Sequence, residues 1–182
     1  GINTILISPR RWGKTSLVKK VLQGIDRPDI KTVFVDIFQC KSEYESYHAF
    51  ATAVIKQTSN KRDAWVEMAK TFLSNISPKF SFGSDPMNDF SLSFEWNPKD
   101  DTEMDILQLP ERIAQKKNVR LVVCLDEFQQ VADFNDSLKF QRKLRTAWQH
   151  QQHVTYCMFG SKKHLMENIF NDKSMPFYKF GD

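Results

Sequence analysis

The residues with the clearest chemistry lie in one short stretch near the start of the chain, residues 8–16. It reads Ser-Pro-Arg-Arg-Trp-Gly-Lys-Thr-Ser, follows an apolar run at 5–7 and precedes apolar residues at helical spacing. A tight loop ending in Gly-Lys-Thr between a strand and a helix is typical of a phosphate site, because backbone N–H groups and the helix N-terminus face the anion. The predicted phosphate-binding residues are Arg10, Arg11, Trp12, Gly13, Lys14, Thr15 and Ser16.

Two side chains of this loop have predicted chemical roles. We expect Lys14 to contact the β- and γ-phosphates of ATP and to act in catalysis, and Thr15 to bind Mg²⁺. The loop departs from the motif G-x-x-x-x-G-K-[ST] at its first position, where this chain has Ser8. Because Gly13 is the glycine next to the phosphates, we expect Ser8 to be tolerated. The alternative is a Gly-Lys-Thr helix start without a ligand.

A second stretch supplies carboxylates. The apolar run 119–125 is followed directly by Asp126 and Glu127. Such a run is typical of a strand buried on both faces of a parallel sheet, and open α/β sheets bind ligands at the carboxyl ends of their strands. We expect Asp126 to hold Mg²⁺ through water and Glu127 to orient and polarise an attacking water. Acids are also favoured at helix N-termini, so it is the combination with the phosphate loop that points to hydrolysis.

A third apolar run, 154–159, ends in Gly160 and Ser161. We expect it to be a strand between the other two, with Ser161 facing the γ-phosphate as a catalytic sensor. An ordinary strand-to-helix turn is an equal alternative for Ser161.

The elements that must position these residues alternate along the chain. Residues 32–36 read as a strand, and apolar residues recur at helical spacing in 44–55, 65–76 and 140–148. Another helix is expected from residue 107 onward, with Pro110 at its start. This alternation predicts an α/β fold, with a mostly parallel sheet covered by helices on both faces.

One segment has a different period. Between residues 79 and 97 apolar residues fall at alternate positions on either side of a polar stretch, which predicts an inserted β-hairpin. Its apolar face packs on helices of this domain or docks a partner, because an isolated hairpin is only marginally stable.

Composition limits the class of protein. At 182 residues, with 41% apolar and 26% charged residues, the chain fits one globular domain. No stretch approaches ~18 consecutive apolar residues, and we expect no secretory leader. Three cysteines without paired spacing argue against disulfides or zinc, so we expect a cytoplasmic protein.

Several stretches resemble the prokaryotic archaeal-type AAA ATPase family, which belongs with the STAND-like and origin-recognition-like P-loop ATPases. They are residues 9–17, 109–114, 125–129 and 159–161. The resemblance implies a P-loop three-layer sandwich with strand order 5-1-4-3-2, the last strand lying outside residues 1–182. It also implies a longer protein with a C-terminal lid and an effector domain. Relatives often carry Tyr-Gly-Arg where this chain has Tyr178-Lys179-Phe180, which puts an arginine acting there on phosphate in doubt.

Two functions from different classes remain open. The first is an ATPase whose hydrolysis drives or resets a conformational change, and the second is a nucleotide switch or scaffold that hydrolyses ATP negligibly. Glu127 favours the first, because binding alone does not require it. A small-molecule kinase is a weaker third hypothesis, since no segment of the sequence indicates an acceptor pocket or a mobile lid.

The partners expected besides ATP and ADP are another copy of the chain or a second protein. The net charge is +4 and the pI is about 8.9, with basic residues at 10–11 and 19–20 and at 142, 143 and 145. Such clusters are more often solvated faces than DNA-binding surfaces, so any contact with nucleic acid is expected to be made by other domains.

Overall fold

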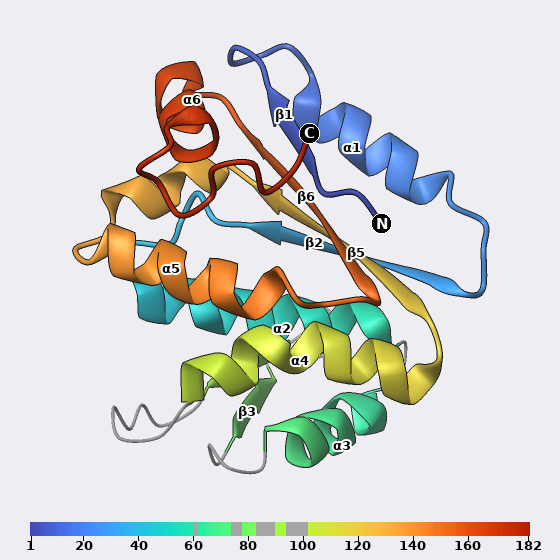
Figure 1. Cartoon of the computed structure of the whole chain (residues 1–182). Helices are drawn as coiled ribbons and strands as arrows, with labels where there is room; N and C mark the ends of the chain where they lie inside the picture. Colours follow the sequence, from blue (N-terminus) through green and yellow to red (C-terminus); the bar gives the residue numbers. More distant parts are fainter. Residues whose placement is uncertain (60–61, 74–77, 83–89, 94–101) are drawn as a thin grey trace.

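The computed structural model describes residues 1–59, 62–73, 78–82, 90–93 and 102–182. A four-stranded parallel sheet forms the centre (Figure 1). Its strands, in spatial order, are β1 (Thr4–Ile7), β6 (Val154–Gly160), β5 (Arg120–Asp126) and β2 (Ile30–Asp36). Counted along the chain, the parallel strands lie in the order 1-4-3-2, which confirms the predicted topology.

The outer edge of β1 is hydrogen-bonded to the last residue of the chain. The N–H of Asp182 donates to the carbonyl of Asn3 at 3.0 Å, and its carbonyl accepts from the N–H of Ile5 at 2.7 Å. This alternation is the pattern of a parallel pair. Asp182 therefore lies on the side of β1 where the predicted order places a fifth strand.

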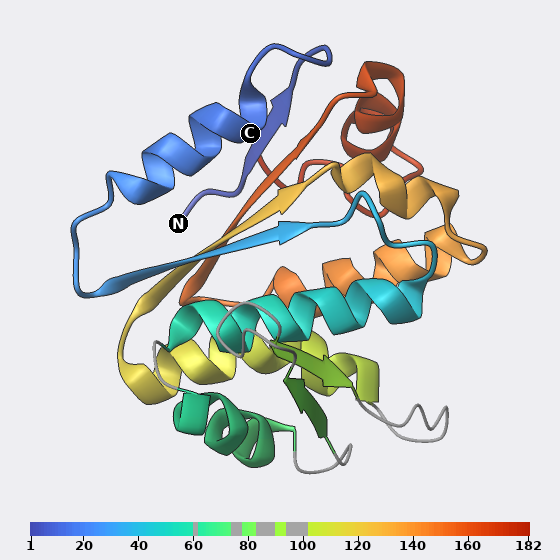
Figure 2. The same ribbon diagram turned by 180° about the vertical axis from the view of Figure 1, so that it is seen from behind.

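Helices cover both faces of the sheet, as the alternation of elements predicts (Figures 1 and 2). The helices are α1 (Lys14–Gln23), α2 (Glu43–Thr58), α3 (Arg62–Phe72), α4 (Thr102–Lys117), α5 (Ser137–Trp148) and α6 (Lys163–Asn171), with a 3₁₀ helix η2 (Phe128–Asp133). On one face, Val18 of α1 packs with Cys124 and Phe159. On the other face, α2, α4, α5 and α6 enclose the larger core.

An outer layer lies on the far side of α2 and α4 from the sheet, formed by α3 and a strand pair (Figure 2). The strands β3 (Lys79–Phe82) and β4 (Phe90–Ser93) are antiparallel, with Phe80 opposite Leu92, so the predicted hairpin pairing is present. Leu92 is 2% exposed, and its N–H donates to Thr52 Oγ1 on α2 at 3.3 Å. The other residues of the predicted insertion, 83–89 and 94–97, lie outside the described residues.

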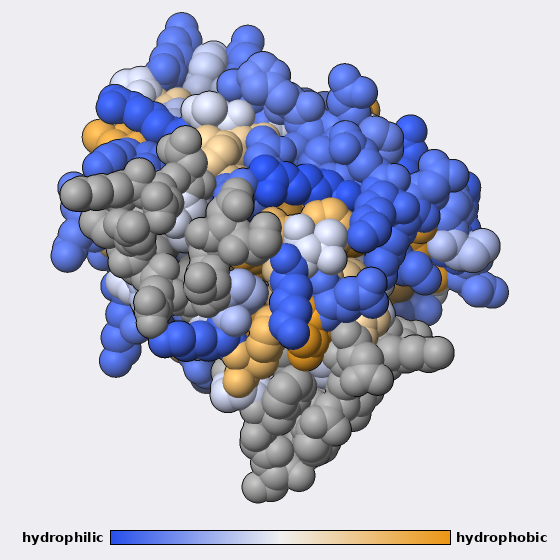
Figure 3. Space-filling view, turned by 90° about the horizontal axis from the view of Figure 1, so that it is seen from below, coloured by the Kyte–Doolittle hydropathy of each residue, from blue (hydrophilic) through white to orange (hydrophobic). Residues whose placement is uncertain are grey.

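The described residues that are visible from this side are mostly hydrophilic, with smaller hydrophobic areas between them (Figure 3). None of the helices in the described ranges is both long enough and apolar enough to span a bilayer. The three cysteines are free thiols.

The expected start of α4 was wrong, because Pro110 lies inside that helix. Proline lacks an N–H, so Pro110 cannot donate to the carbonyl of Ile106, four residues before it in the helix. The carbonyl of the next residue, Leu107, accepts a hydrogen bond from Gln151 Nε2 at 2.9 Å. A side chain from the segment before β6 thus provides a donor at the turn that Pro110 disturbs.

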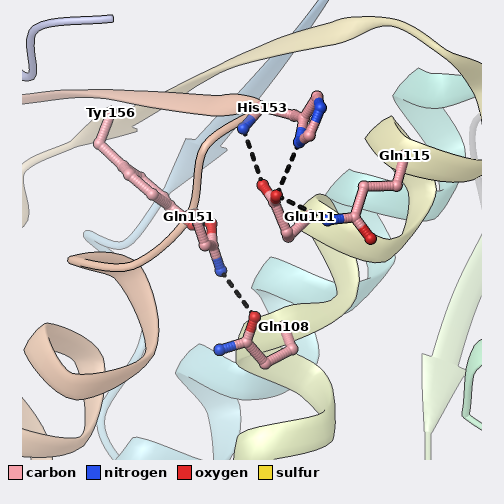
Figure 4. Close-up of polar contacts among 6 residues, drawn as sticks. All are labelled: Gln108, Glu111, Gln115, Gln151, His153 and Tyr156. Carbon is pink, nitrogen blue, oxygen red and sulfur yellow. Dashed lines mark hydrogen bonds and ion pairs between the residues drawn. The ribbon is translucent and has the colours of Figure 1, made fainter.

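The same surface of α4 holds the start of β6 through a buried carboxylate (Figure 4). Glu111 accepts from the backbone N–H of His153 at 3.0 Å, from His153 Nδ1 at 2.8 Å and from Gln115 Nε2 at 2.9 Å. Gln151 links the same region to Gln108 at 3.5 Å. This network fixes the amino end of β6, at the opposite end of the strand from Ser161.

Candidate active site

Three strand ends bring the predicted site residues to one edge of the sheet. β6 lies between β1 and β5, so the loop after β1, the acids after β5 and Ser161 after β6 converge. They surround a pocket of about 330 Å³. Its lining residues are Arg10, Arg11, Gly13, Lys14, Thr15, Ser16, Glu127 and Ser161.

The loop after β1 takes two left-handed residues to reach α1. Arg11 has φ 66° and Gly13 has φ 76°, and Gly13 precedes the first residue of the helix. This conformation favours glycine at position 13. Ser8 does not have a positive φ, so a side chain is sterically acceptable at the position where the motif has its first glycine.

The ammonium group of Lys14 lies across the loop. Its Nζ donates to the carbonyls of Ser8 at 2.7 Å and of Pro9 at 3.0 Å. Lys14 is thus held at the opening of the pocket by two backbone oxygens. Neutral carbonyls are weaker partners for an ammonium than phosphate oxygens are, so an anion in the pocket can replace them.

The phosphate loop and the acidic pair meet through one short hydrogen bond. Thr15 Oγ1 donates to Asp126 Oδ2 at 2.7 Å, although the residues are 111 positions apart in the chain. A hydroxyl and a carboxylate side by side are oxygen ligands of the kind that Mg²⁺ prefers. Thr15 and Asp126 therefore fit a magnesium site, either directly or through water.

The surroundings of Asp126 carry an excess of negative charge. Its carboxylate is buried, with 5% of the residue exposed, and burial raises its pKa. The hydrogen bonds from Thr15 and from the N–H of Glu127 lower the pKa, whereas the carboxylates of Asp36 and Glu127 raise it further. The net shift is upward, as expected where a positive charge would stabilise the folded site.

Glu127 lies across the pocket from the loop and has a left-handed backbone, with φ 52° and ψ 41°. Ser161 Oγ donates to Glu127 Oε2 at 2.8 Å, and Gln129 Nε2 donates to the same oxygen. The backbone N–H of Glu127 donates to Asp126 Oδ1 at 2.9 Å. The two acids that follow β5 therefore face different partners, Asp126 toward the loop and Glu127 toward the end of β6.

Of the ten predicted site residues, Asp126 and Trp12 are not part of the pocket lining. Asp126 reaches the site through its hydrogen bond with Thr15, whereas Trp12 is 75% exposed, although the neighbouring Arg10 and Arg11 line the pocket. Sequence reasoning gave no role to Gln129, which is 2% exposed and contacts Glu127. The available signal was its place in the Asp-Glu-Phe-Gln stretch.

The C-terminal segment does not bring an arginine to the pocket by way of position 180. Lys179 has φ 53°, the left-handed conformation that favours glycine. Phe180 is 8% exposed and packs in the core. The guanidinium of Arg145 lies 4.8 Å from the centre of its ring.

Comparisons with known proteins give matches in structure alone. A scan of protein-family models and a search of curated proteins found no match. A Walker-type ATPase of Pyrococcus abyssi is similar with a TM-score of 0.57 and 14% identity, over 97% of this chain and 46% of that protein. The ORC2 protein of Aeropyrum pernix, solved with ADPNP and ADP, has a TM-score of 0.51 and 17% identity over 90% of this chain and 36% of that protein.

The ORC1 protein of Aeropyrum pernix, solved in complex with DNA, matches with a TM-score of 0.58 and 11% identity. That match covers 100% of this chain and 38% of ORC1, so the chain spans less than half the length of each of these three proteins. The strand order of the sheet, the loop between β1 and α1, and the three structural matches all indicate the same fold. The chain has the α/β fold of the archaeal Walker-type ATPase and of the two ORC proteins.

Proposed function

We propose that this domain binds ATP with Mg²⁺ in the pocket at residues 8–16 and hydrolyses it, and that hydrolysis drives or resets a conformational change in a larger protein. The observation that carries the proposal is the contact between Thr15 and Asp126 at 2.7 Å, with Glu127 lining the same pocket. A phosphate loop, two oxygens suited to a metal ion and a second carboxylate, all at the carboxyl ends of the strands, are the parts that phosphoryl transfer to water requires.

Each residue has a defined task in this scheme. Lys14 exchanges the carbonyls of Ser8 and Pro9 for phosphate oxygens, and the N–H groups at the start of α1 bind the same phosphates. Bound Mg²⁺ would neutralise charge on the phosphates, held by Thr15 and by Asp126. Glu127 orients a water for attack on the γ-phosphate and accepts its proton, while Ser161 holds the carboxylate.

Nucleotide binding by structural neighbours supports ATP as the ligand. The ORC2 structure contains ADPNP and ADP, and the Pyrococcus protein is described as an ATPase. Because the chain spans less than half of each neighbour, the conformational change and its effector belong to the proposal for the whole protein.

DNA contact is not assigned to Lys143 and Arg145 of α5. Lys143 is paired with Glu103 at 2.6 Å, and Arg145 donates to the carbonyl of Tyr178 at 3.4 Å and packs over Phe180. These two cations are engaged within the domain. We therefore place any nucleic-acid contact of the full protein elsewhere, although ORC1 itself was solved with DNA.

Two measurements on the full-length protein test the proposal. Calorimetry with ATP, in the presence and absence of Mg²⁺, is expected to show binding that the metal strengthens. Single-turnover assays with enzyme in excess are expected to show phosphate release that depends on Mg²⁺. Binding without phosphate release would support the nucleotide-switch alternative, and the absence of binding would refute both.

A further inference from the structure

Gln129 contacts the proposed catalytic carboxylate from inside the protein. It is the second residue of η2 and is 2% exposed. Its Nε2 donates to Glu127 Oε2, the oxygen that Ser161 Oγ also contacts. Among the described residues no hydrogen bond reaches the other oxygen, Oε1 of Glu127, which remains available for a water in the pocket.

The backbone of Glu127 explains why two donors are placed there. For a residue other than glycine, a φ of 52° is an uncommon backbone conformation, which persists only where the surrounding structure fixes it. The N–H of Gln130 donates to the carbonyl of Glu127 at 2.9 Å and fixes the main chain. The amide of Gln129 and the hydroxyl of Ser161 fix the carboxylate group. The direction of the side chain is thereby determined from two sides.

Gly160, the last residue of β6, makes room for this arrangement. A Cβ built on Gly160 would overlap Gln129 Oε1 and would lie 2.9 Å from Met166 Sδ. Because residue 160 has no side chain, the amide of Gln129 can occupy the space beside Glu127. Gly160 directly precedes Ser161, the other residue that donates to Glu127.

A purely structural role does not account for the amide. Gln129 Oε1 is buried and has no hydrogen-bond partner among the described residues. Leaving a buried polar atom unpaired is unfavourable, and an aliphatic side chain of similar size would avoid it. The amide group therefore costs stability, and the partner that the described part of the chain gives it is Glu127.

We propose that Gln129 is a positioning residue for Glu127, which holds one carboxylate oxygen so that the other faces the attacking water. This inference rests on the proposed ATP hydrolysis. It predicts that loss of the amide slows the hydrolytic step and leaves nucleotide binding intact, because Gln129 does not line the pocket.

The test uses the full-length protein with Gln129→Leu, which keeps the volume and removes the amide. Single-turnover hydrolysis is expected to fall about 10- to 100-fold, the size of effect that a misplaced catalytic group produces. The dissociation constant for ATP with Mg²⁺ is expected to stay within about twofold of the wild type. Gln23→Leu, at an exposed glutamine at the end of α1, is the control and should hydrolyse ATP at the wild-type rate.

A double-mutant cycle separates positioning from a general effect on folding. If Gln129 acts through Glu127, adding Gln129→Leu to Glu127→Gln causes no further loss of rate. Gly160→Ala gives a second route, because it displaces the Gln129 amide without changing it, and it decides the question if Gln129→Leu does not fold.

Three outcomes would overturn the inference: wild-type rates in Gln129→Leu, additive losses in the cycle, or a parallel loss of nucleotide affinity. A wild-type protein that releases no phosphate contradicts the proposed function itself, and the inference with it. An active wild type with an equally active Gln129→Leu contradicts the positioning role alone.

Discussion

At the scale of single residues, the site is built from side chains that the chain brings together over long distances. Thr15 and Asp126 are 111 positions apart, and Glu127 and Ser161 are 34 apart. In the proposed function, the first contact pairs a hydroxyl with a carboxylate to hold a metal ion, and the second pairs a carboxylate with a donor that sets its direction. Lys14 contributes a single charge to the same proposal, at a pocket that it lines.

Lys14→Ala is expected to weaken binding of ATP with Mg²⁺ by roughly one to two decades, about 1.5–3 kcal/mol. The reason is the loss of one charge-assisted contact to phosphate. Isothermal calorimetry measures the change, and the melting temperature should stay near that of the wild type, because Lys14 contacts only loop carbonyls. Lys20→Ala, an exposed lysine on the same helix, is the control and should bind ATP normally. Equal affinity in Lys14→Ala would place the site elsewhere.

At the scale of elements, the sheet is secured at positions away from the pocket. α4 holds the amino end of β6 through Glu111, and α2 covers the outer edge of β2 through Gln57. Gln57 donates to the carbonyl of Phe34 at 2.8 Å and accepts from its N–H at 2.9 Å. These two hydrogen bonds of Gln57 take the place of those from a neighbouring strand, since β2 is an edge strand of the described sheet.

Glu111→Ala is expected to lower the free energy of unfolding by about 2–3 kcal/mol, because the backbone N–H of His153 loses its acceptor in a partly buried place. Chemical denaturation measures the change. The control is Glu167→Ala, which removes an exposed pair with Lys163 at 3.6 Å and should change stability by less than about 0.5 kcal/mol. Equal effects of the two substitutions would show that the network around Glu111 is not stabilising.

The same carboxylate predicts a dependence of stability on pH. Burial would raise the pKa of Glu111, but its hydrogen bonds from His153 outweigh burial and lower the pKa below 4.5. Because the folded pKa is the lower one, the contribution is present above about pH 4.5 and is lost as the pH falls through the folded pKa. Denaturation at a series of pH values should therefore show a steeper loss below pH 4.5 in the wild type than in Glu111→Gln. Parallel curves would contradict this assignment.

Gln57→Ala is expected to lower the free energy of unfolding by about 0.5–1.5 kcal/mol and to increase self-association, because it uncovers the edge of β2. Denaturation and light scattering measure the two effects. Gln23→Ala, an exposed glutamine at the end of α1, is the control and should change neither. Unchanged scattering together with unchanged stability would show that the contact with Phe34 has no protective role.

The elements and the site differ in how far the sequence could predict them. The runs before Asp126 and Gly160 are long and apolar, so their strands and their order follow from pattern and resemblance. The predicted start of α4 was wrong because proline favours the first turn of a helix, whereas here the packing of α4 in the core extends the helix on both sides of Pro110. The role of Gln129 could not be predicted, since it depends on the left-handed backbone of Glu127 and on Gly160, which lies 31 positions after Gln129. Such contacts between distant residues leave no periodic pattern.

At the scale of the whole molecule, the proposed chemistry is confined to the carboxyl ends of the strands of the sheet. The pocket lies where β1, β5 and β6 end, while α3 and the β3–β4 pair lie outside α2 and α4 (Figures 1 and 2). The three structural neighbours are more than twice as long as this chain. We therefore expect hydrolysis at the pocket to act on parts of the full protein beyond this domain, which makes hydrolysis itself the central claim.

Glu127→Gln tests that claim most directly, in the full-length protein under single-turnover conditions. Glutamine keeps the shape of the side chain and its hydrogen-bonding capacity but loses the charge that polarises water. Affinity for ATP should be unchanged or slightly tighter, since a negative charge near the phosphates is removed, whereas hydrolysis should fall about 10²–10⁴-fold. Asp126→Asn should instead weaken the Mg²⁺ dependence of binding, because its carboxylate contacts Thr15. A hydrolysis rate in Glu127→Gln equal to that of the wild type would contradict the catalytic assignment and leave the nucleotide switch as the better description.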